Sequence, residues 1–170
     1  MNTSSNQNLN SSSNMTAWGI GPRMALLTTP FIVIFLTIHI AFYPIFLLPI
    51  DYIFILIIGC ALIFIGLLLL LKSRKLINEA FDASELVTES IYGYIRHPVY
   101  AAFILFICPG ITCLFNSWIC FFIPLILYMI FRFLIIREEN YCLEKFGERY
   151  EHYKNNVNRI LPRFRKYKPI

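Results

Sequence analysis

The sequence IYGYIRHPVY, at Ile91–Tyr100, separates two long apolar halves of the chain. Within ten residues it holds an Arg-His pair, a proline and three tyrosines. Ionisable residues at the depth where a helix enters lipid are costly, and they usually mark functional sites. The stretch therefore predicts membrane-spanning helices on both sides of it and a site at the boundary.

The composition indicates an integral membrane protein. Of 170 residues, 58% are hydrophobic and only 15% are charged, whereas soluble domains carry about a quarter charged residues. The net charge is +5, but no basic surface separate from the apolar segments is visible. We therefore expect no nucleic-acid partner, and we assign the positive charge to membrane topology and to anionic lipid headgroups.

The five cysteines do not indicate a metal site or a disulfide framework. No two of them form a Cys-x-x-Cys pair, and four lie in apolar runs. Small buried hydrophobic residues explain them best.

Apolar runs predict four transmembrane helices, at about residues 24–48, 52–71, 99–115 and 118–136. The expected fold is an all-α polytopic membrane bundle with a cytosolic interfacial segment and a C-terminal cytosolic helix. We divide the chain into a disordered Asn/Ser-rich tail at 1–17, the first two spans within 18–71, and a region at 72–170 that carries the site. In that last region we expect Lys72–Lys75 to end the second span and 76–95 to lie at the interface. We expect Arg137–Asn156 to be helical, with a weak point at Gly147.

Charge predicts the orientation. With four spans, both termini and the 72–97 loop share one side, and all 15 Lys and Arg residues lie on or near that side. The positive-inside rule makes this side cytoplasmic.

Two polar clusters then end at the same face. Taken alone, Arg96-His97-Pro98 has a structural explanation: an arginine at the membrane interface followed by a proline, which suits the first turn of a helix. Taken alone, Glu138-Glu139 is explained as part of a solvent-exposed helix face. Together, beside Arg132 and Arg137, they favour a pocket with one charged and one apolar wall, suited to a polar cofactor and a lipid-dissolved substrate.

Two motifs resemble those of the isoprenylcysteine carboxyl methyltransferases and the related phospholipid N-methyltransferases. The resemblance covers about residues 72–163. The motifs are Leu86-Val-Thr-x-x-Ile-Tyr-x-x-Ile-Arg-His-Pro-x-Tyr100, and Glu138-Glu139 with Phe146-Gly147, Tyr150, Tyr153 and Arg159-x-x-Pro162.

This resemblance implies an integral membrane enzyme that uses S-adenosylmethionine, with its cofactor pocket on the cytosolic side and a lipophilic or lipidated substrate. Carried over by position, the implied cofactor contacts are Ser84, Glu85, Leu86, Val87, Tyr92, His97, Pro98, Val99, Tyr100 and Glu138. We expect Glu138 to lie beside the 84–100 segment.

The chain departs from the family pattern at two positions. Leu134 stands where similar enzymes place a substrate-side arginine, so Arg132 or Arg137 is the candidate replacement. Ser90 replaces a glycine. A carboxylate acceptor needs no base, whereas an amine acceptor must first lose a proton, for which Glu139 or His97 is the candidate.

Two other readings remain open at this stage. Membrane sterol reductases that use NADPH carry a similar Arg-His-Pro-Asn-Tyr-x-Gly-Glu element, but Val99, Ala102 and Phe103 replace its Asn, Gly and Glu. A non-catalytic membrane protein of the same fold would explain Leu134. The methyl acceptor and the oligomeric state are not determined by the sequence.

Overall fold

The computed structural model describes residues 19–82 and 85–168, and this part of the chain is helical. The predicted all-α architecture is confirmed: within the described residues there are two isolated β-bridges and no strand. The elements are α1 (Gly21–Ala41), α2 (Tyr52–Asp82), η1 (Ser90–Gly93), α3 (Pro98–Ala101), η2 (Ala102–Ile107), α4 (Cys108–Leu114), η3 (Trp118–Phe121), α5 (Phe122–Phe146) and α6 (Glu148–Asn156).

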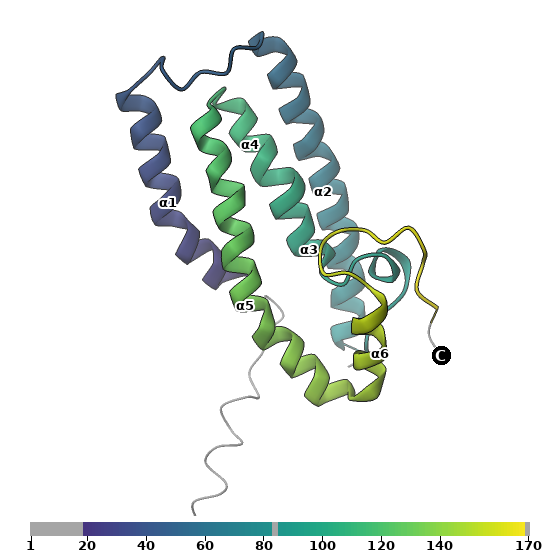
Figure 1. Ribbon diagram of the computed structural model, residues 1–170. Coiled ribbons are helices and arrows are strands. Elements are labelled where there is room, and N and C mark those ends of the chain that lie inside the picture. Colours follow the sequence, from purple (N-terminus) through teal and green to yellow (C-terminus); the bar gives the residue numbers. More distant parts are fainter. Residues whose placement is uncertain (1–18, 83–84, 169–170) are drawn as a thin grey trace, which may run out of the picture.

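The long helices run side by side (Figure 1). The segments α3, η2 and α4 form one continuous helix, which packs against α2, while α1 packs against α5. The loop between α1 and α2 lies at one end of the bundle. At the other end are α6 and the start of α3, which brings the two polar clusters to the same end (Figure 1).

Three helices among the described residues are long and apolar enough to cross a membrane. They are Gly21–Ala41, Tyr52–Glu79 and Trp118–Phe146. The remaining predicted span, at 99–115, corresponds to the shorter apolar helix Pro98–Leu114. Its 17 residues rise roughly 25 Å, whereas a typical hydrocarbon core is about 30 Å thick.

The second helix extends beyond its predicted end. Lys72–Lys75 does not terminate it, and α2 continues without a break to Asp82, so residues 76–82 extend α2 and do not form a separate short helix. The residues Leu-Ile-Asn-Glu-Ala-Phe-Asp follow without proline or glycine, and a change to polar residues alone does not end a helix. The predicted disordered tail lies outside the described residues.

Small residues let α2 approach the 98–114 helix closely. A Cβ atom at Gly59 would lie 2.9 Å from the Gly110 carbonyl oxygen, and one at Gly66 would lie 2.6 Å from Ile107 Cγ1. The π-helical turn η2 ends two residues before Pro109, which lies in the first turn of α4. Proline lacks an N–H and crowds the preceding turn, so wider winding there avoids the conflict.

Candidate active site

The loop that carries the Arg-His-Pro motif is held in place by the chain that follows α6. The Arg96 N–H donates to the Asn158 carbonyl at 2.8 Å, and the His97 N–H donates to the Arg159 carbonyl at 2.9 Å. These bonds form one short parallel pairing, with Ile95 beside Asn158. Pro98 then begins the helix, where its missing N–H has no cost.

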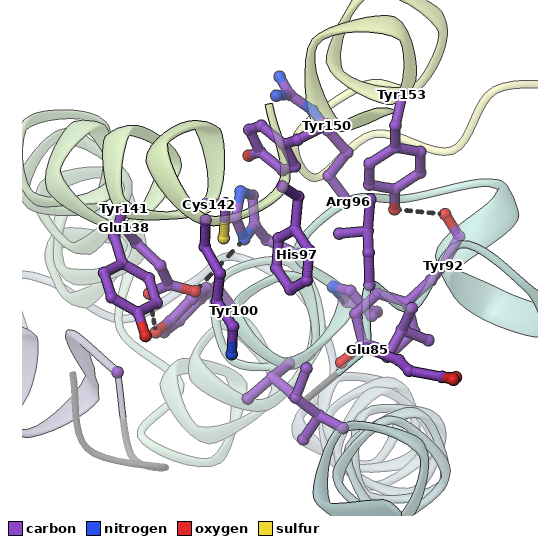
Figure 2. A pocket seen from close by; sticks show the side chains of 18 of the residues that line it. Glu85, Tyr92, Arg96, His97, Tyr100, Glu138, Tyr141, Cys142, Tyr150 and Tyr153 are labelled. Carbon is purple, nitrogen blue, oxygen red and sulfur yellow. Dashed lines mark hydrogen bonds and ion pairs between the residues drawn. The ribbon is translucent and has the colours of Figure 1, made fainter. Parts of the chain in front are cut away.

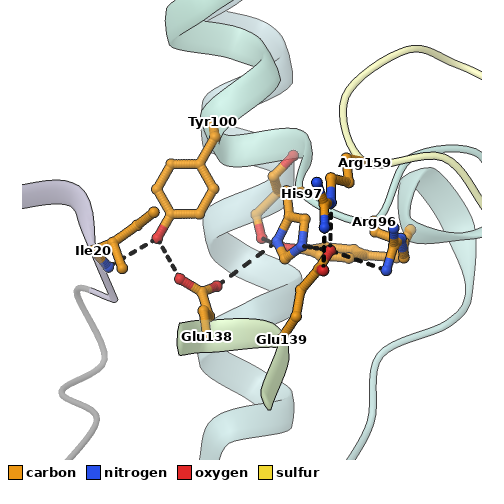
Figure 3. A network of polar contacts seen from close by, with 9 residues as sticks. Ile20, Arg96, His97, Tyr100, Glu138, Glu139 and Arg159 are labelled. Carbon is orange, nitrogen blue, oxygen red and sulfur yellow. Dashed lines mark hydrogen bonds and ion pairs between the residues drawn. The ribbon is translucent and has the colours of Figure 1, made fainter. Parts of the chain in front are cut away.

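A buried ion cluster joins the loop to α5 (Figure 3). Glu139 is 2% exposed. Its two carboxylate oxygens accept hydrogen bonds from Arg159, from Nε at 2.9 Å and from the terminal nitrogen at 2.7 Å. The Arg96 guanidinium lies 3.0 Å from Oε1 of the same carboxylate. Such a carboxylate is compensated by two cations, and removing it would leave buried charges unpaired.

Glu138 occupies the neighbouring position but faces a different partner. Its Oε2 accepts a hydrogen bond from the Tyr100 hydroxyl at 2.8 Å. The Ile20 N–H in turn donates to that hydroxyl at 3.1 Å (Figure 3). The turn before α1 is therefore tied to α3 and α5 through one tyrosine oxygen, and the predicted proximity of Glu138 to the 84–100 segment is confirmed.

His97 lies between the two glutamates. Its Nε2 is 3.4 Å from Glu139 Oε1 and its Nδ1 is 3.7 Å from Glu138 Oε1. The imidazole also contacts Phe131 edge to face, with ring centroids 6.1 Å apart. Both glutamates are thus kept near the start of α3 by a side chain that is itself buried.

Two tyrosines fix the far wall. The Tyr153 hydroxyl donates to the Tyr92 carbonyl at 2.6 Å, and the Tyr92 hydroxyl donates to the Ser73 carbonyl at 3.3 Å. Burial raises the pKa of both hydroxyls above its usual value. Both therefore remain protonated donors at physiological pH and hold α6 against η1 and α2.

These elements enclose a pocket of about 180 Å³. Side chains from α5, α6 and the 85–100 segment converge on it (Figure 2). Nine of the ten predicted cofactor residues line it, and the tenth, Ser84, lies outside the described residues. The nine are Glu85, Leu86, Val87, Tyr92, His97, Pro98, Val99, Tyr100 and Glu138.

A second cavity, of about 560 Å³, adjoins the first. It lies between α1, the 98–114 helix and α5, and its wall is largely aliphatic. The two cavities share Arg74, Val99 and Tyr100. A polar pocket and an apolar cavity therefore meet at the first turn of α3.

Comparison with known proteins agrees with this geometry. The family model for phospholipid methyltransferases matches residues 54–149. The chain belongs to this family. It is also 35% identical over 77 residues to the protein-S-isoprenylcysteine O-methyltransferase of Schizosaccharomyces pombe, a match that covers 45% of this chain and 33% of that protein. The resemblance inferred from the two motifs is thus confirmed at the level of the family.

The glycine that Ser90 replaces in the family pattern has a structural explanation. Ser90 has a φ of +53°, in the left-handed region that favours glycine. Ser90 is the first residue of the 3-10 helix η1, which places Tyr92 in the pocket wall. The glycine of the family pattern suits this backbone conformation better than serine does.

The structure does not bring Arg132 or Arg137 to the site. Both side chains are exposed on α5, and neither lines either cavity. Leu134, one helical turn before Glu138, packs against the apolar core cluster around Phe131 and Ile135. No cation on this part of α5 therefore faces the place where the cavities meet.

Several pocket residues were not predicted as site residues. They are Gly19, Arg74, Ile77, Arg96, Tyr141, Cys142, Lys145, Phe146, Tyr150 and Tyr153. Tyr150 and Tyr153 belong to the motif that carried the resemblance, and their spacing of three places them on one face of α6. Gly19, in the turn before α1, and Arg74, on α2, had no comparable signal, because both lie far away in sequence from the two motifs.

Proposed function

We propose that this protein is an S-adenosylmethionine-dependent methyltransferase that acts on a lipophilic acceptor. The observation that carries the proposal is the junction of the polar pocket and the apolar cavity at Arg74, Val99 and Tyr100. A methyl transfer needs donor and acceptor aligned in contact, and alignment is most of what such an enzyme supplies. The junction is where two chemically different ligands can meet.

The pocket residues fit the cofactor. When bound, S-adenosylmethionine supplies a methyl group on a sulfonium. The carboxylates of Glu85 and Glu138 would hold its cationic parts, and Arg74 and Arg96 its carboxylate. The aromatic rings of the pocket suit its adenine. The buried Tyr150 hydroxyl makes no hydrogen bond of good geometry among the described residues but lies close to the Arg96 guanidinium, so the two together can face a polar ligand.

The second cavity suits an apolar chain. Its threonine hydroxyls are already donating within their own helices: Thr28 to the Met24 carbonyl and Thr112 to the Pro109 carbonyl, both at 2.8 Å. The wall therefore presents little polar chemistry to a ligand. Burial of apolar surface is then the main source of affinity.

We propose a carboxylate acceptor of the isoprenylcysteine type in preference to an amine, which would need a base at the junction. Of the two candidate bases, His97 lines the pocket between the two glutamates and is the one retained for an amine acceptor. Both oxygens of Glu139 are held by Arg159, with Arg96 beside them, so we propose that Glu139 positions the loop instead of accepting a proton. Arg132 and Arg137 remain proposals for contact with a substrate headgroup outside the cavities.

We further propose that Pro98–Leu114 is the fourth span, with the pocket at the cytoplasmic face and both termini on that side. The short helix fits if Pro98 lies at the edge of the hydrocarbon core, where the bilayer can thin to match it. Positive residues at this end of the bundle support the orientation.

A methyl-transfer assay tests the proposal. Native membranes containing the protein are incubated with tritiated-methyl S-adenosylmethionine, and the extracted lipid product is treated with base. A base-labile label supports a carboxyl ester, and a base-stable label points to an amine or carbon acceptor. Competition by S-adenosylhomocysteine is expected. Protection by NADPH alone would overturn the assignment, and absence of both would favour a non-catalytic protein of this fold.

A further inference from the structure

The chain after α6, residues 157–168, returns across the motif loop and is fixed at both ends. We name it the C-terminal strap. Ile160 is buried in the main core cluster. The Arg163 N–H donates to the Tyr94 carbonyl at 3.1 Å, and the Tyr167 N–H donates to the Gly93 carbonyl at 2.9 Å. The Tyr167 hydroxyl also bonds His152 Nδ1 at 2.9 Å. The backbone of the strap is therefore fixed against the motif loop and α6.

Between these fixed points the strap turns apolar side chains outward. Phe164 is fully exposed and Leu161 is 61% exposed. Single exposed hydrophobic residues are ordinary, but these two alternate with the exposed cations Arg163, Arg165 and Lys166. The strap contains no Asp or Glu, so no acidic side chain within it neutralises the positive charge.

The position of the strap indicates what this surface meets. Gly93 and Tyr94, to which it is bonded, lie four to five residues before Pro98, where the short apolar helix begins. Figure 1 shows the strap beside α3, whereas α6 lies farther along, towards the end of α5. In the proposed orientation this is the headgroup level of the cytoplasmic leaflet. Tyr94, 38% exposed, adds an aromatic side chain of the kind enriched there.

We propose that the strap is an interfacial anchor that inserts Phe164 at the acyl–headgroup boundary and binds anionic phospholipid headgroups through Arg165 and Lys166. The Arg163 guanidinium donates to the Asn156 carbonyl and adds to the positive charge beside them. Apolar burial and attraction of cations to an anionic surface act together in such elements. Because the strap bonds the loop that carries His97, lipid contact would also steady the pocket wall. The proposal rests on the membrane orientation and not on the reaction.

Tryptophan quenching tests it on the full-length protein. Phe164→Trp is placed in a background with Trp18→Phe and Trp118→Phe, and the protein is reconstituted in phosphatidylcholine vesicles with or without phosphatidylglycerol. Lipids brominated near the headgroup end of the acyl chain are expected to quench this tryptophan, more strongly with phosphatidylglycerol. Glu148→Trp, at an exposed position on α6, is the matched control and should stay unquenched.

Adding Arg165→Glu and Lys166→Glu to Phe164→Trp should abolish the extra quenching caused by phosphatidylglycerol. A water-exposed emission maximum with no quenching in either lipid would overturn the proposal, and it is the result expected if the strap instead meets a soluble acidic partner. Leu161→Trp gives an independent reading should Phe164→Trp alter folding, which thermal unfolding would detect. If the Phe164→Trp protein transfers methyl groups but its tryptophan is not quenched, the anchor proposal is refuted and the proposed function is not.

Discussion

The polar pocket and the apolar cavity share Val99 and Tyr100 but are built by opposite means. The pocket is assembled from segments distant in sequence, held together by ions and hydrogen bonds: Glu139 with Arg159, Tyr100 with Glu138, and Tyr153 with the Tyr92 carbonyl. The cavity is mainly the space left between three helices, and its threonine hydroxyls donate to carbonyls of their own helices. The pocket therefore depends on individual bonds, whereas the cavity depends on side-chain volume.

Because of this difference, substitutions should affect cofactor binding and acceptor binding independently. A change of charge in the pocket should affect the cofactor and leave the acceptor alone. A change of volume in the cavity should do the reverse.

The largest effect is expected for Glu138→Gln. The change removes the charge that accepts from Tyr100 and that would face the cofactor's cationic groups. Hydrogen bonds to charged groups contribute about 1.5–3 kcal/mol, so S-adenosylmethionine affinity should fall roughly 10- to 100-fold, as measured by equilibrium binding in detergent. Glu144→Gln, at an exposed position on the same helix, should change nothing. Unaltered affinity in Glu138→Gln would show that the pocket is misassigned.

Gly19→Ala should come next, because it acts on the junction itself. Gly19 has a φ of +54°, and a Cβ atom there would crowd the Tyr100 hydroxyl and lie 2.9 Å from Glu138 Oε2. Left-handed backbone costs an alanine about 1–2 kcal/mol. This cost favours a displaced turn over the one that contacts Tyr100, and a roughly tenfold fall in the population of the competent turn should lower kcat/KM about tenfold. Gly21→Ala is the matched control, since its Cβ meets nothing within 4 Å. Equal activity of the two variants would sink the idea that the turn before α1 shapes the junction.

Ala25→Phe should affect the acceptor side only. Ala25 lines the apolar cavity, and each CH₂ group of acceptor chain that phenylalanine displaces removes about 0.8 kcal/mol. The KM for a prenylated cysteine should rise roughly fourfold for each displaced group, with cofactor affinity unchanged. Leu26→Phe, on the exposed side of α1 at 73% exposure, is the control. A changed cofactor affinity would contradict the separation of the two cavities.

The smallest effect is a gain in stability from Ser90→Gly. Relief of the left-handed serine should add about 1 kcal/mol and raise the unfolding temperature by about 2–4 °C, followed by intrinsic fluorescence during heating. Glu89→Gly is the opposite control: Glu89 has an ordinary extended backbone, with φ of −101°, so glycine there should lower the unfolding temperature. A lowered value for Ser90→Gly would mean that the serine makes a compensating contact.

Much of the fold could be predicted from apolar run length, and the meeting of Glu138 with the motif loop followed from topology. The break at Gly147 was also predicted, and there the backbone takes a φ of +54° between α5 and α6. The end of α2 was not predicted, because polarity reports solvent and not the end of a helix. The sequence therefore predicts where apolar spans lie better than it predicts where a helix ends once it leaves the apolar region.

The two arginines show why proximity in sequence misleads. Residues along a helix turn by about 100° each, so Arg137 points about 100° away from Glu138, and Arg132, six residues earlier, points about 120° away. Only Leu134, one turn before Glu138, shares its face. The Glu139–Arg159 pair was equally hidden, because its partners lie 20 residues apart and meet only after the chain reverses through α6.

The exposed residues on the rim of the apolar cavity have a kinetic consequence. Ala25 and Thr29 on one side, and Phe103 and Ile111 on the other, line the cavity and are themselves exposed, so the cavity opens sideways between α1 and the 98–114 helix. An acceptor entering there would arrive by two-dimensional diffusion in the leaflet, while the donor arrives from three-dimensional solution. Turnover should then follow the mole fraction of acceptor in the bilayer, and adding inert lipid at constant total acceptor should slow it by surface dilution.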